Sequence, residues 1–123
     1  MGAPLARQEE PAMGISTHIL DTTIGMPAEG VEVNLYRSVG GVWRHLGRGT
    51  TNADGRVSDL LGEAPDVGHY SIDFAVGDYF DRHGVEAFYP RVDIEFLIHD
   101  PPRAHYHVPL LLNPYGYSTY RGS

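Results

Sequence analysis

The sequence predicts an all-β domain folded as a sandwich of two sheets. Short segments in which apolar and polar residues alternate recur along the chain, and turn signals rich in Gly, Pro, Asn or Asp separate them. The 123 residues include 15 Gly, 9 Pro and 8 Tyr, a composition that favours strands and turns over long helices. About eight short strands at regular spacing are typical of a sandwich. The length allows one such domain with its own core.

The first half of the chain contains four predicted strands. They cover residues 15–21, 31–37, 43–51 and 56–60. The Asn-Ala-Asp-Gly segment at 52–55 separates the last two, and it is a strong turn signal because Asp-Gly tolerates the positive φ angles of tight hairpins. Arg56 is therefore expected to be the first residue after a tight turn.

The second half contains four more predicted strands and one short helix. The strands cover residues 70–76, 92–98, 105–112 and 117–121. Residues 77–84 are expected to form one or two helical turns, with Asp78 near the N-terminus, where the helix dipole favours a carboxylate. Two proline-containing pairs, at 101–102 and 113–114, break the chain between the later strands.

Charge and composition argue against several classes of partner. Nine scattered Lys and Arg against sixteen Asp and Glu give a net charge of −7, so we expect no nucleic-acid or anionic-membrane surface. No segment approaches the roughly 20 apolar residues of a membrane span. Cysteine is absent, which removes disulfides, thiolate metal sites and a cysteine nucleophile, and fits a reducing compartment. We therefore expect a cytoplasmic protein.

The first 14 residues differ in character from the rest. Arg7 is followed by Glu9 and Glu10, and the segment lacks the apolar core of a secretory signal. We expect residues 1–14 to be a disordered leader and residues 15–123 to form the domain.

Three features could carry chemistry: His18 on the first strand, Arg56 after the turn, and the His105/His107 pair near the end. Residues two apart on a strand share a face, so this pair points the same way, roughly 7 Å apart. Histidine can take and return a proton near neutral pH, and an adjacent arginine can orient and neutralise an anionic or enol-like substrate. Two histidines and an arginine would suffice for hydrolysis without a metal, although spacing alone does not show that they meet.

Each of these residues also has a simpler interpretation. A lone strand histidine such as His18 is more often a partly buried, hydrogen-bonded residue, and Arg56 alone is more often solvated. The His105/His107 pair could instead bind a metal, because alternating imidazoles reach a common ion, but such a site needs a third or fourth ligand. Further candidate ligands, none of which lies in a recognisable motif, are Asp21, His45, His69, His83 and His99. The chain lacks G-x-S-x-G, P-loop and G-x-G-x-x-G motifs, which argues against a serine hydrolase, a nucleotide phosphotransferase or a dinucleotide enzyme.

Five segments together resemble a known family. They read STHILD at 16–21, G-x-P-A-E-G-V at 25–31, NADGR at 52–56, FYPRVDIEF at 88–96 and HYHVPLLLNPYGYSTYRGS at 105–123. The chain resembles the 5-hydroxyisourate hydrolases of the transthyretin-related family from about residue 15 to its last residue. The final Tyr-Arg-Gly-Ser is the most specific part, because this enzyme family ends with it and the hormone-carrying transthyretins do not.

This resemblance implies a transthyretin-like β-sandwich of two four-stranded sheets, with one short helix around 78–83. It also implies a homotetramer, a dimer of dimers, in which edge strands pair between subunits and are thereby hidden. The active sites of such a tetramer lie at the dimer–dimer interface, in a channel whose walls come from both subunits.

The resemblance further implies hydrolysis of 5-hydroxyisourate to 2-oxo-4-hydroxy-4-carboxy-5-ureidoimidazoline in urate degradation, without a metal or other cofactor. The catalytic residues would be His18, Arg56 and His107, with Arg56, Tyr120 and Ser123 binding the substrate. The role of His105 and the choice of general base stay open. Two alternatives stay open as well: a transthyretin-like carrier of a small aromatic ligand, and a metalloenzyme using the His105/His107 pair.

Overall fold

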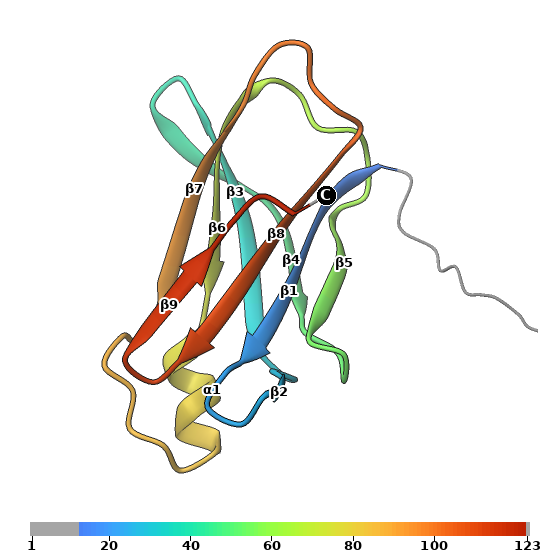
Figure 1. Cartoon of the computed structure of the whole chain (residues 1–123). Coiled ribbons are helices and arrows are strands. Elements are labelled where there is room, and N and C mark those ends of the chain that lie inside the picture. Colours follow the sequence, from blue (N-terminus) through green and yellow to red (C-terminus); the bar gives the residue numbers. More distant parts are fainter. Residues whose placement is uncertain (1–12, 123) are drawn as a thin grey trace, which may run out of the picture.

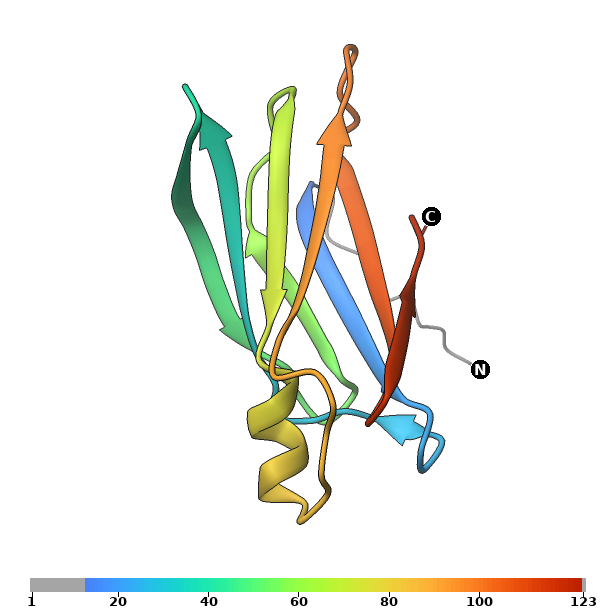
Figure 2. The ribbon, with the colours of Figure 1, turned by 90° about the vertical axis from the view of Figure 1, so that its left-hand side faces the viewer.

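The computed structural model describes residues 13–122, which form two β-sheets packed face to face (Figure 1). The first sheet contains β1 (Gly14–Asp21), β2 (Met26–Pro27), β5 (Arg56–Leu61), β8 (His105–Asn113) and β9 (Gly116–Thr119). The second contains β3 (Glu32–Val39), β4 (Val42–Thr50), β6 (Gly68–Phe74) and β7 (Val92–Ile98). Viewed edge-on, the sheets are two layers, with the helix α1 (Val76–Arg82) at one end (Figure 2). The predicted sandwich is confirmed.

The strand order places β1 at the centre of the first sheet. β1 pairs with β8 on one side, in parallel, and with β2 and β5 on the other, antiparallel; β9 continues the sheet beyond β8. The second sheet has the order β4-β3-β6-β7, all antiparallel. β7 and β9 are therefore edge strands of the two layers, and they lie on the same side of the sandwich, at the left in Figure 1.

The core fills the space between the layers. Alternate residues of β1, namely Ile15, Thr17 and Ile19, are fully buried there. Leu35 and Ile72 of the second sheet are also fully buried in this core. Because side chains alternate along a strand, the intervening residues of β1 point to the opposite, outer face of the first sheet.

The helix packs at the end of the sandwich through two aromatic residues. Tyr79 and Phe80 are buried, and the Tyr79 hydroxyl donates a hydrogen bond of 2.8 Å to Oδ2 of Asp21, at the end of β1. Asp78 lies in the first turn, as predicted.

The predicted boundaries differ from the observed ones in a few places. β2 was not expected, because two residues carry no alternation, so the first sheet has five strands, one of them only two residues long. Val76 belongs to α1 rather than to the preceding strand, and β9 covers 116–119 rather than 117–121. β1 begins at Gly14, one residue earlier than expected, and residues 1–12 of the proposed leader lie outside the described part. Within residues 13–122, no helix is long and apolar enough to cross a membrane.

Candidate functional site

His18 and Arg56 face each other across two paired strands. They are direct register partners in the antiparallel pairing of β1 with β5, which puts both side chains on the outer face of the first sheet. Arg56 is exposed, while His18 is partly buried. The hairpin turn and the first strand, far apart in sequence, thus meet at one point.

The turn before Arg56 sets its position through local hydrogen bonds. Oδ1 of Asn52 accepts hydrogen bonds from the backbone N–H groups of Asp54 at 2.9 Å and of Arg56 at 3.0 Å. Gly55 has a φ of 74°, a left-handed conformation that favours glycine, and its carbonyl accepts a 2.8 Å hydrogen bond from the Ile19 N–H. The predicted turn therefore anchors β5 on β1.

The surroundings of His18 favour its neutral form. Burial, followed by the positive charge of Arg56, lowers the pKa of the His18 imidazole, while Asp54 acts in the opposite direction with a smaller effect. A neutral imidazole has a lone pair that can accept a proton, so His18 is suited to act as a base near neutral pH.

His107 and His105 lie on the same face, on the other side of β1. In the parallel register His107 is opposite Ser16, His105 is opposite Gly14, and His18 is opposite Pro109. From strand geometry, the Cα atoms of His18 and His107 are about 8 Å apart, a distance that a small heterocyclic substrate could bridge. The structure thus brings together the three residues predicted to be catalytic on one sheet face.

Ser16 joins the two histidines of β8. Its Oγ lies 2.8 Å from Nδ1 of His107 and 3.0 Å from Nε2 of His105, within hydrogen-bonding distance of both. Ser16 was not among the site residues predicted from the sequence. Its position two before His18 on a strand indicated a shared face, but nothing in the sequence identified its partners on β8.

The C-terminal segment returns to His107. Gly122 forms an isolated antiparallel bridge with His107, and its N–H donates a 2.8 Å hydrogen bond to the His107 carbonyl. A Cβ at Gly122 would lie 2.7 Å from Cδ2 of the His107 ring, so glycine allows this close approach. Ser123, predicted to bind substrate, lies outside the described residues.

Tyr120 has different surroundings from the histidines. Its side chain is largely exposed, and the residue lines a cavity of about 440 Å³ together with Arg121. Tyr106 and Val108, whose side chains belong to the buried core, line the same cavity. The proposed contact of Tyr120 with substrate stays a prediction.

The metal interpretation of the His105/His107 pair requires a third or fourth ligand beside the two imidazoles. Both ring nitrogens that face Ser16 are already hydrogen-bonded to its hydroxyl. Within residues 13–122, no group of three or more His, Asp or Glu side chains is arranged to hold a metal ion.

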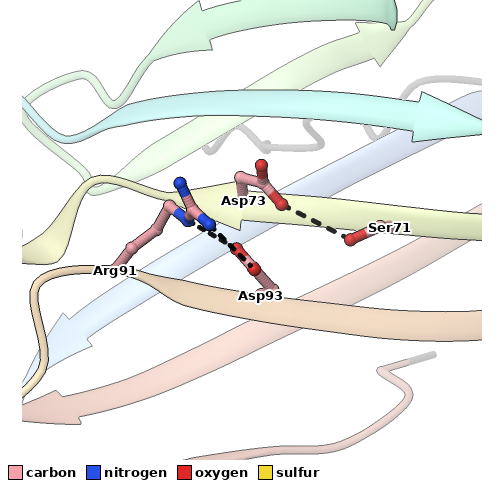
Figure 3. A network of polar contacts seen from close by, with 4 residues as sticks. All are labelled: Ser71, Asp73, Arg91 and Asp93. Atoms are coloured by element: carbon pink, nitrogen blue, oxygen red, sulfur yellow. Dashed lines mark hydrogen bonds and ion pairs between the residues drawn. The ribbon is translucent and has the colours of Figure 1, made fainter. Parts of the chain in front are cut away.

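A second polar cluster lies on the outer face of the other sheet (Figure 3). Asp73 of β6 and Asp93 of β7 are register partners, Ser71 lies beside Asp73, and Arg91 forms an ion pair of 3.1 Å with Asp93. Burial raises the pKa of Asp73 to about 6, and the hydrogen bond with Asp93 and the negative charge of Asp93 act in the same direction. The two sheets separate this cluster from the histidine face.

The fold and the outer-face site define a class of protein: a transthyretin-type sandwich that carries a histidine–arginine site on one sheet. The comparisons agree with that class. A family model described as the HIUase/Transthyretin family matches residues 15–122, and the chain belongs to this family.

Similar proteins include both 5-hydroxyisourate hydrolases and transthyretins. The chain is 50% identical over 116 residues to 5-hydroxyisourate hydrolase 2 of Rhizobium meliloti, covering 89% of this chain and 95% of the relative. The solved 5-hydroxyisourate hydrolase of Klebsiella pneumoniae matches with a TM-score of 0.78 and 42% identity, covering 89% of this chain and 98% of that one. Sea bream transthyretin in complex with thyroxine matches with a TM-score of 0.82 and 28% identity, covering 88% of this chain and 93% of that one.

Proposed function

We propose that this protein hydrolyses 5-hydroxyisourate to 2-oxo-4-hydroxy-4-carboxy-5-ureidoimidazoline, a step of urate degradation. The observation that carries the proposal is the cross-strand pairing of His18 with Arg56 on the same sheet face as His107. The backbone resembles that of a hydrolase and that of a transthyretin about equally well, so the fold does not distinguish the two functions. The 50% sequence identity to an enzyme with this name supports the hydrolase. The residues on the sheet face therefore decide between the two.

In the proposed mechanism, His18 is the general base. Its lowered pKa keeps the imidazole neutral, so it removes a proton from water as the water oxygen attacks a ring carbonyl of the substrate. Arg56, opposite His18, stabilises the negative charge that develops on the carbonyl oxygen. His107 then donates a proton to the ring nitrogen as the carbon–nitrogen bond breaks and the ring opens. Water is consumed, and no metal or cofactor takes part in these steps.

We also propose that Tyr120 and Ser123 contact the substrate. The support is the return of the chain to His107 at Gly122, where the Gly122 N–H donates a hydrogen bond to the His107 carbonyl. Tyr120 is exposed next to this segment and free of core packing on much of its surface.

The site calls for a second subunit, and we propose a homotetramer arranged as a dimer of dimers. In one chain the three histidines of this face are only partly buried, and a second subunit packed on the face would supply the walls of a binding pocket. The edge strands β7 and β9 lie on one side and carry the exposed apolar residues Leu97 and Tyr117. Pairing of these edges between subunits would protect them. Sedimentation velocity should then give the mass of four chains.

We also propose that the enzyme acts in the cytoplasm, in keeping with its lack of cysteine.

A transthyretin-like carrier is the second candidate, favoured by the TM-score of 0.82 to the sea bream protein. A carrier of an apolar ligand gains affinity from apolar surface and has little use for His18, Arg56 and His107 together. It should bind a small aromatic ligand without changing it.

A spectrophotometric assay separates the two candidates. Urate oxidase generates 5-hydroxyisourate in situ, and the decay of its near-ultraviolet absorbance is followed without protein, with the wild type, and with His107→Ala. The wild type should accelerate decay, and His107→Ala should be slower by about 10²- to 10⁴-fold, the usual cost of losing a general acid or base. The matched control is His45→Ala, since this histidine is exposed on β4 of the other sheet. Identical decay with and without the wild type would reject the hydrolase.

A further inference from the structure

Ser16 is buried between two imidazole rings. It is 5% exposed, and its Oγ is within hydrogen-bonding distance of Nδ1 of His107 and Nε2 of His105. The surrounding strands are firmly connected, because Thr17 Oγ1 donates a 2.6 Å hydrogen bond to the Val108 carbonyl. The contact is therefore built into the pairing of β1 with β8 rather than made by a mobile surface group.

Counting protons limits this contact to two arrangements. A serine hydroxyl has one proton and two lone pairs, and it could accept from both rings only if its own proton went to a third acceptor. Within residues 13–122 the hydrogen bonds of Ser16 Oγ are to these two rings, so it donates to one ring nitrogen and accepts from the other. In the first arrangement Ser16 accepts from Nδ1–H of His107 and donates to Nε2 of His105. In the second the direction is reversed, and a neutral His107 then carries its proton on Nε2.

The two arrangements differ in what His107 can do. A proton donated to substrate must be exchanged at Nε2, because Nδ1 faces Ser16. In the first arrangement Nδ1 keeps its proton whether His107 is neutral or protonated, so the hydrogen bonds to Ser16 and His105 need not rearrange during turnover. In the second, protonation of His107 places a proton on Nδ1 opposite a donating hydroxyl, which forces the chain of hydrogen bonds to reverse.

We propose that Ser16 is a positioning residue that, together with His105, keeps the proton on Nδ1 of His107 and so directs Nε2 to the substrate. The inference rests on the proposed function and extends it by giving His105 a role. His105 acts as the acceptor that holds the Ser16 hydroxyl proton, and Ser16 in turn accepts from His107. A histidine partner of this kind fixes ring tautomer and orientation without touching the substrate.

The test compares the wild type with Ser16→Ala, Ser16→Thr and the control Ser38→Ala, on β3 of the other sheet. Two readouts are used: kcat and KM in the absorbance assay, and the ¹⁵N spectrum of the histidine rings, which reports the tautomer of His107. Ser16→Ala should lower kcat about 10- to 100-fold, the usual cost of losing a partner that orients a functional histidine, with KM within about twofold. The spectrum should change from an Nδ1–H to an Nε2–H tautomer. Ser16→Thr retains the hydroxyl and should retain the wild-type tautomer, and Ser38→Ala should change neither readout.

His105→Ala gives an independent test that also works if Ser16→Ala does not fold. Without an acceptor at 105, the Ser16 hydroxyl is free to donate to Nδ1 of His107, so the tautomer should change although Ser16 is present. An unchanged Nδ1–H tautomer in His105→Ala, or a folded Ser16→Ala with wild-type kcat, would overturn the inference. Failure of the wild type to accelerate 5-hydroxyisourate decay would instead reject the proposed function, and the ring spectra would still decide the positioning role.

Discussion

Replacing Gly55 with alanine should separate the turn that positions Arg56 from the chemistry that Arg56 performs. Gly55 has a φ of 74°, and an alanine Cβ there would lie 2.5 Å from the Ile19 carbonyl oxygen and 3.1 Å from Cβ of Pro27. The left-handed conformation costs a non-glycine residue about 1–2 kcal/mol. Relief of the contact with backbone adds about 1–3 kcal/mol, as for other overpacked sites. Gly55→Ala should therefore lower the free energy of unfolding by about 2–5 kcal/mol.

Gly40→Ala is the matched control for this experiment. Gly40 also has a positive φ, of 60°, but a Cβ there would meet nothing within 4 Å. Gly40→Ala should therefore lower the free energy of unfolding only by the cost of the left-handed conformation, about 1–2 kcal/mol. Urea denaturation at one protein concentration gives both values, since the stability of the proposed tetramer would depend on concentration.

Gly55→Ala should also reduce activity in molecules that remain folded. Moving Gly55 away from Ile19 shifts Arg56 relative to His18, and a displacement of about 1 Å can cost on the order of 10²-fold in rate. We expect kcat/KM to fall at least about tenfold in Gly55→Ala and to be unchanged in Gly40→Ala. Equal stability and equal activity of the two variants would refute the argument that this turn positions the site.

Three further predictions follow from other features. Tyr79→Phe removes the hydrogen bond to buried Asp21 and should cost about 1.5–3 kcal/mol in urea denaturation, whereas Tyr115→Phe, at an exposed tyrosine, should cost nothing measurable. The pKa of Asp73 is raised to about 6, so the folded state holds a proton that the unfolded chain releases; wild-type stability should fall between about pH 4 and about pH 6, and Asp73→Asn should remove that fall. Exhaustive treatment with a chelator should leave the hydrolysis rate unchanged, and loss of activity restored by a divalent metal would support the metalloenzyme instead.

Much of the fold could be predicted from the sequence, because strand periodicity is local. β7 was predicted at its observed bounds, and the helix was placed within one or two residues, since the alternating and turn-forming residues are contiguous. The two-residue β2 could not be predicted, because two residues are too few to show an alternating pattern and the strand is defined only by its pairing with β1.

The sequence by itself determined which residues belong to the family motifs and which share a strand face. It indicated that His105 and His107 point the same way, and that Arg56 follows a tight turn. Only the tertiary structure decided that β5 pairs with β1 in the register that sets Arg56 opposite His18, and that β8 runs parallel to β1 with Ser16 between two histidines. The reason is physical: alternation along a strand is set by the local backbone, whereas strand register depends on burying the apolar faces of distant segments together.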